Sequence, residues 1–138
     1  MELDKVREFF ENNDHFARFI GCEIVEVGEG TARVKMPVGL EHLNGVGTVH
    51  GGAIFGLADF AFAIAVNSLG KVAVALNCMI SYLKPGRNES VLTALARTLS
   101  VSNSTALIEV RIEDEAGQLI SLFQGTAYRT REELSGIL

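Results

Sequence analysis

The sequence has only two cysteines, and they lie far apart in the chain. Cys22 and Cys78 match no spacing of metal ligands, so we expect both to act as small apolar residues. A chain of 138 residues buries about two thirds of its unfolded surface, which is enough for a stable fold without disulfides or metals. We therefore predict a single domain over residues 1–138 and no metal site.

Clusters of basic residues are also missing. The chain carries 12 Lys and Arg against 17 Asp and Glu, a net charge of −5, which argues against nucleic acid as a partner. An anionic ligand would have to be held by local groups. The sequence begins MELDKVREFF, which does not have the features of a signal peptide, so we expect a protein of the reducing cytoplasm.

The main apolar run is too short to cross a membrane. Residues 53–66 read AIFGLADFAFAIAV and would form a helix about 21 Å long, whereas a span needs roughly 20 residues. The one polar side chain in this run is Asp59. Taking a carboxylate out of water costs several kcal/mol unless something uses or satisfies it. Asp59 is therefore the main catalytic candidate, and its apolar setting predicts a raised pKa.

The hydrophobic periodicity predicts an α+β fold. Apolar residues at helical spacing indicate a helical arm within residues 1–20, and a nearly all-apolar stretch indicates a central helix over 52–68. Alternating apolar residues predict a hairpin before the glycine-rich loop 39–52, and three or four antiparallel strands after the helix. A curved antiparallel sheet wrapped around the helix would cover most of it, and another subunit could complete the cover.

The strand predicted at residues 72–83 is nearly continuous in apolar side chains. This pattern is typical of a central strand that is covered on both faces. The segment Lys84-Pro85-Gly86-Arg87 then ends the strand.

One face of the central helix carries almost no side chains. Four positions at i, i+4, i+7 and i+11 share this face: Gly52, Gly56, Asp59 and Ala63. Either a substrate or a partner helix packs there, or the small residues let a strand cross closely.

The helix start, His50-Gly51-Gly52, exposes backbone N–H groups. These donors and the helix dipole suit an oxyanion or a phosphate, or the glycines serve a turn. Asp59 lies about 10 Å along the helix from these donors, whereas both must lie within about 3 Å of one reacting carbon. One helix cannot supply both groups, so we predict a composite site in a two-fold dimer.

The segment LNGVGTVHGGAIFGLADFAFAIAVNS resembles the signature of PaaI-type acyl-CoA thioesterases, which belong to the hotdog-fold superfamily. The pattern has Asn44, then His50-Gly51-Gly52 six residues later, then Asp59 nine residues beyond the histidine. The resemblance extends over almost the whole chain. It implies a curved sheet around the long helix, a homodimer with a continuous sheet, often a dimer of dimers, and hydrolysis of an acyl-CoA substrate without a metal or other cofactor.

The resemblance also implies a role for each residue of the pattern. Asp59 would be the nucleophile or the general base that activates water, and an activated thioester needs no further relay. A backbone N–H of Gly51 or Gly52 would polarise the carbonyl group. Asn44 would orient the water or the carboxylate. His50 would either fix the loop by bonding to backbone or reach the thioester.

The chain departs from the family at one position. Some relatives place a serine in the site four residues after the turn that follows the helix, where this chain has Ala75 and then Asn77. Asn77 either substitutes for the serine in binding substrate or is an ordinary polar residue of the strand.

The remaining candidates have competing interpretations. Lys84 and Arg87 are the natural groups to bind the phosphates of coenzyme A, or they are solvated surface charges. Three further candidates for the phosphates are Arg97, Arg129 and Arg131. We expect His42 to be an exposed loop residue and His15 to belong to the arm. Two phenylalanines of the helix, Phe55 and Phe62, are expected in the core rather than in the lining of an acyl pocket.

Two other functions fit the same fold. A hydratase or dehydratase of acyl thioesters would need an His-Phe-Pro-Gly-like loop, or an Asp and a His five residues apart, and neither occurs. A non-catalytic acyl-CoA-binding module would have little use for the charge of Asp59. We therefore predict hydrolysis of an aryl-acyl, short-chain or medium-chain acyl-CoA.

Overall fold

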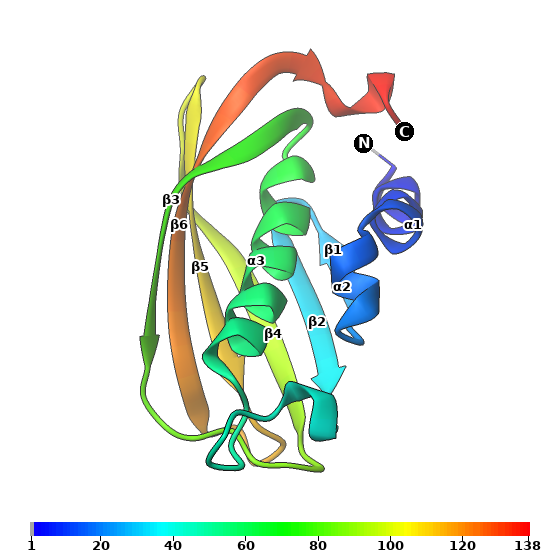
Figure 1. The fold of residues 1–138 in the computed structure, drawn as a ribbon. Coiled ribbons are helices and arrows are strands. Elements are labelled where there is room, and N and C mark those ends of the chain that lie inside the picture. Colours follow the sequence, from blue (N-terminus) through cyan, green and yellow to red (C-terminus); the bar gives the residue numbers. More distant parts are fainter. Residues whose placement is uncertain (1) are drawn as a thin grey trace.

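The chain folds into one antiparallel sheet that curves around a long helix (Figure 1). A computed structural model describes residues 2–138, and its strands pair in the order β1-β2-β4-β5-β6-β3. The helices are α1 (Leu3–Asn13), α2 (His15–Phe19) and α3 (Gly51–Asn67), with short 3-10 turns η1 (Leu40–His42) and η2 (Leu134–Gly136). The strands are β1 (Glu23–Gly28), β2 (Thr31–Pro37), β3 (Lys71–Tyr82), β4 (Val91–Val101), β5 (Thr105–Glu113) and β6 (Leu119–Glu133). Figure 1 shows α3 between the sheet and the α1–α2 pair.

The central helix α3 lies one residue earlier at each end than the predicted range 52–68. Its end is tied to the start of β3 through Asn67, whose Oδ1 accepts the Ala73 N–H at 3.0 Å. The Asn67 amide also donates to the Ala63 carbonyl at 2.8 Å, so one side chain joins the last turn of the helix to the sheet. Within residues 2–138, no helix is long and apolar enough to span a membrane.

The small-residue face of α3 is the side that the chain leaves most open. Gly52 and Asp59 are exposed there, although most of the helix is buried. At Gly56 the close neighbour is the N-terminal arm, because a Cβ on Gly56 would lie 3.0 Å from the side chains of Phe16 and Ile20. Within the chain, the N-terminal arm covers Gly56, and the crossing strand that we considered does not.

Strand β3 lies at the edge of the sheet, so the prediction of a central strand is wrong within one chain. Its apolar side chains are more than half exposed at Val74, Leu76, Met79 and Tyr82. A run of apolar residues therefore does not by itself place a strand at the centre of a sheet. An unpaired apolar edge is also a surface on which another strand can pair.

The aromatic core joins α3 to the middle of the sheet. The Phe62 ring lies 5.6 Å from that of Phe123 on β6, centroid to centroid, and the Phe55 ring lies 5.4 Å from it. Phe62 and Phe123 are buried, and Phe55 is half-buried. Phe62 is therefore a core residue, as predicted, and the half-buried Phe55 packs against the core.

We expect Gly125→Ala to destabilise the fold by about 1–3 kcal/mol, the usual effect of forcing extra atoms into a packed core. The new Cβ on β6 would lie 2.6 Å from the buried Phe62 ring. Denaturant unfolding measures the change. Gly136→Ala is the control, since its Cβ would meet no atom within 4 Å. Equal free energies of unfolding for the two variants would contradict this packing.

Candidate functional site

The loop before α3 is shaped by the Asn44 side chain. Its Oδ1 accepts the N–H groups of Val46 at 3.0 Å and Thr48 at 3.1 Å. Its Nδ2 donates to Thr48 Oγ1 at 2.9 Å. Asn44 is half-buried, and one of its two amide N–H groups serves this bond while the other is available to a ligand.

The start of α3 is capped by His50. The His50 Nδ1 accepts the Gly52 N–H at 2.8 Å, and the His50 carbonyl accepts the N–H groups of Ala53 and Ile54. Among the residues that the structure describes, the N–H of Gly51 has no acceptor. A helix N-terminus with one free N–H offers a single donor to an anionic group, aided by the helix dipole.

A pocket of about 430 Å³ opens at this helix start. Asn44 and Gly51 line it together with Tyr82 and Lys84, which lie at and just after the end of β3. Tyr82 also donates its hydroxyl to the Gly51 carbonyl at 3.0 Å. Nothing in the sequence pattern pointed to Tyr82, because its contact with the helix start depends on how β3 lies against α3.

Asp59 lies farther along α3, on the exposed side of the helix. Desolvation by its apolar neighbours raises its pKa, as predicted, and the negative charge of Asp14 raises it further. Asp14 caps α2 by accepting the Ala17 N–H at 3.0 Å. The N-terminal arm therefore places a second carboxylate near Asp59.

A β-bulge in β3 decides which side chains accompany Asp59. The register with β6 shifts between Ala75 and Asn77, so the two residues lie on opposite faces of the sheet. Cys78 pairs with Gly125, a position that faces the Phe62 ring and hence α3. Asn77 therefore points away from the helix, and the structure does not bring it together with Asp59.

Cys78 is the strand residue that accompanies Asp59. The pKa of its thiol is raised, first by burial and then by the charge of Asp59. Regular strand alternation from Ala75 would favour Asn77 instead. No signal in the sequence marks the extra residue of the bulge, Leu76.

Within the single chain, Asp59 and the helix start lie apart. Eight residues of α3 separate Asp59 from Gly51, a rise of about 12 Å. The pocket at the helix start is lined by the preceding loop, the first turn of α3 and the segment after β3, without Asp59. On one chain, therefore, the two groups lie too far apart to act on a single reacting carbon.

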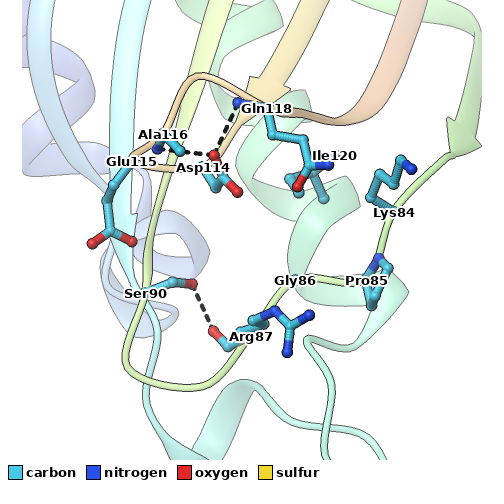
Figure 2. A pocket seen from close by; sticks show the side chains of 10 residues that line it. All are labelled: Lys84, Pro85, Gly86, Arg87, Ser90, Asp114, Glu115, Ala116, Gln118 and Ile120. Carbon is cyan, nitrogen blue, oxygen red and sulfur yellow. Dashed lines mark hydrogen bonds between the residues drawn. The ribbon is translucent and has the colours of Figure 1, made fainter.

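A second pocket, of about 440 Å³, adjoins the first through Lys84, Pro85 and Gly86. Figure 2 shows Lys84 and Arg87 on the segment after β3, opposite the turn between β5 and β6. The carboxylates of this turn already accept backbone N–H groups: Asp114 from Ala116 and Gln118, and Glu115 from Val91. Lys84 and Arg87 are both exposed.

Two of the other arginine candidates are engaged within the chain. Arg97 pairs with Glu109 at 3.1 Å, and Arg129 donates to the Ser102 carbonyl at 2.8 Å. Arg131 is exposed near the end of β6.

The expectation that His42 is an exposed loop residue is wrong. The His42 side chain is buried, its Nδ1 accepts the Gly39 N–H at 2.9 Å, and its Nε2 bonds to the Ile20 carbonyl. It joins the loop before α3 to the N-terminal arm, a long-range contact that local sequence does not specify. His15 is exposed on α2, within the arm as expected.

Known proteins resemble this chain along most of its length. The sequence model of the Thioesterase superfamily matches residues 46–121. A putative esterase of Archaeoglobus fulgidus is 39% identical over 131 residues, which cover 95% of this chain and 85% of that one. The acyl-coenzyme A thioesterase PaaI of Escherichia coli is 38% identical over 124 residues, which cover 90% of this chain and 89% of PaaI.

Solved structures agree with the sequence matches. The E. coli PaaI protein, from the phenylacetic acid degradation operon, has a TM-score of 0.91 at 35% identity and covers 95% of both chains. A hypothetical thioesterase of Streptococcus pneumoniae, solved with coenzyme A, has a TM-score of 0.83 at 30% identity and covers 89% of this chain and 95% of that one. Together with the curved sheet around α3, these matches show that the chain belongs to the thioesterase superfamily and is an enzyme with the hotdog fold.

Proposed function

We propose that this enzyme hydrolyses acyl-CoA thioesters to a free acid and coenzyme A, in a site shared by two copies of the chain. One observation carries the proposal: α3 bears both a carboxylate on its open side, Asp59, and a free backbone donor, the N–H of Gly51. The names of the relatives support acyl-CoA as the substrate class. The two free cysteines suit the reducing cytoplasm as its location.

Asp59 either attacks the thioester carbonyl carbon itself or activates a water molecule that attacks it. As a nucleophile, its oxygen bonds to the carbonyl carbon, the C–S bond breaks, coenzyme A leaves as a thiolate, and water hydrolyses the anhydride. As a general base, it takes a proton from a water that attacks the same carbon while the thiolate leaves. After single-turnover hydrolysis in ¹⁸O water, label in Asp59 demands the covalent route, with water attacking the Asp59 carboxyl carbon of the anhydride.

The helix start stabilises the negative charge that develops on the carbonyl oxygen. The Gly52 N–H is occupied by His50, which leaves Gly51 as the glycine whose N–H donates to the oxyanion. His50 acts by fixing the loop. Asn44 uses its remaining amide N–H to orient the attacking water or the carboxylate.

Two copies are required because Asp59 and Gly51 lie about 12 Å apart on one helix, yet both must lie about 3 Å from one carbon. A two-fold axis brings the helix start of one copy to Asp59 of the other. The unpaired, apolar edge of β3 is where the sheet would continue into the second copy. The proposed assembly is this homodimer, which can pair further into a dimer of dimers.

Lys84 and Arg87 bind the phosphates of coenzyme A. Lys84 lines both pockets, so a pantetheine arm whose thioester lies at Gly51 passes Lys84 on its way to Arg87. The nearby carboxylates of Asp114 and Glu115 are held by backbone N–H groups, which reduces their competition for the two cations.

Removing the charge of Asp59 should stop hydrolysis without unfolding the protein. We expect thiol release from an acyl-CoA panel by the wild type, and a kcat at least about 100-fold lower for Asp59→Asn. Because folding raises the pKa of Asp59, its ionised form opposes folding, so the variant should have the higher Tm at pH 7. This difference should vanish as the pH falls through the raised pKa to below the ordinary value of 3.8. Binding of acyl-CoA without thiol release, or a wild-type kcat for the variant, would contradict the proposal.

Two inactive variants should regain activity when they share a dimer. Asp59→Ala removes the carboxylate, and Gly51→Pro removes the N–H at a helix position that accepts proline. A mixed dimer keeps one intact site, so we expect about half of the wild-type activity per dimer. Gly51→Ala is the steric control: like proline it adds a Cβ about 3.2 Å from the Tyr82 side chain, but it keeps the N–H, whose loss typically lowers kcat about 100-fold to 1000-fold, so it should be the more active of the two Gly51 variants. Verified mixed dimers without activity would exclude a shared site.

Asp14→Asn should lower the pKa of Asp59, because it removes a negative charge that disfavours the ionised carboxylate. The acid limb of the kcat/KM profile should move to lower pH. Asparagine caps a helix as well as aspartate does, so α2 should remain intact. Asp4→Asn changes the net charge equally at an exposed position of α1 and is the control. Equal shifts for both variants would refute the local effect of Asp14.

A further inference from the structure

The Tyr82 side chain covers the first turn of α3. Its hydroxyl donates to the Gly51 carbonyl at 3.0 Å. Its ring also fills the space beside the Gly51 Cα, since a Cβ there would lie 3.2 Å from Tyr82 Cζ and Oη. The tyrosine thus contacts Gly51 both by a hydrogen bond and by packing.

The bond from Tyr82 adds to the helix's own bonding of the same peptide unit. The carbonyl of the Gly51–Gly52 peptide accepts from Tyr82 as well as from the i+4 N–H of α3, and the N–H of this peptide donates to His50 Nδ1 at 2.8 Å. Two bonds at opposite ends of one peptide fix its plane, and each strengthens the other by polarising the unit.

The adjacent peptide, between His50 and Gly51, carries the free N–H. Its carbonyl accepts from Ala53 and Ile54, which orients the peptide along the helix axis. The backbone torsions of Gly51 join these two peptides, and because a glycine has no Cβ to restrict them, they depend on the hydrogen bonds of the first turn. Tyr82 and His50 both bond to the Gly51–Gly52 peptide, which follows these torsions in the chain.

We infer that Tyr82 is a positioning residue, which fixes the first turn of α3 so that the Gly51 N–H points steadily into the pocket that both residues line. The inference rests on the proposed function, because Gly51 is the oxyanion donor in that proposal. Tyr82 itself donates to a backbone carbonyl and acts on the reaction through Gly51.

The test is Tyr82→Phe, which keeps the ring and removes the hydroxyl. We expect kcat for acyl-CoA hydrolysis to fall about 5-fold, the effect of one net hydrogen bond, with KM nearly unchanged. The acid limb of the pH profile should stay in place, since Asp59 sets it. Tyr128→Phe is the matched control, because Tyr128 is exposed on β6 and outside both pockets, and it should keep the wild-type kcat.

A second readout is independent of activity. Loss of the Tyr82 bond should loosen the Gly51–Gly52 peptide, so amide hydrogen exchange at Gly52, measured by NMR, should become about 5-fold faster in Tyr82→Phe. Tyr128→Phe should leave this rate unchanged.

The outcomes separate the two proposals. Unchanged kcat in Tyr82→Phe, or a raised KM with unchanged kcat, overturns the positioning role. Unchanged exchange at Gly52 overturns the peptide clamp itself. If the wild type frees no thiol, the proposed function fails, and the exchange rates then decide whether Tyr82 holds the helix start.

Discussion

The burial of α3 is the constraint on which the rest of this structure depends. The helix is apolar nearly all round, so it must be covered on nearly every side. The sheet curves around it, and α2 covers it at Gly56 through Phe16 and Ile20. What stays open is the strip that holds Gly52 and Asp59. The sheet and the arm bury the apolar sides of α3. Asp59, the one carboxylate of the helix, therefore lies on the side that they leave exposed.

Side chains also pack closely against the first turn of α3. A Cβ on Gly51 would lie 3.2 Å from Tyr82, and one on Gly52 would lie 3.0 Å from His50 Nδ1. Tyr82 packs against Gly51 and His50 packs against Gly52, and both side chains bond to the peptide between the two glycines. Capping takes up the Gly52 N–H, and among the described residues the N–H of Gly51 has no acceptor, so it is the glycine donor of the first turn that a ligand can use.

Much of the fold and part of the candidate site follow from the sequence. Local periodicity predicts the helix within one residue at each end, and an apolar setting predicts the raised pKa of Asp59. The failures have physical causes. The bulge at Leu76 turns Asn77 away from α3, because one extra residue reverses the alternation of a strand. His42 is buried because its ring bonds to Ile20, a contact that only the folded chain creates.

The sequence by itself determined the apolar helix, the His50-Gly51-Gly52 start and the position of Asp59 about 10 Å beyond it along the axis, because helical geometry converts spacing into distance. It also determined that one helix cannot bring these groups together. Only the tertiary structure decided that β3 is an edge strand, that Cys78 faces Asp59, and that Tyr82 holds the Gly51 carbonyl. These features depend on strand order and register, which arise from contacts between residues far apart in the chain.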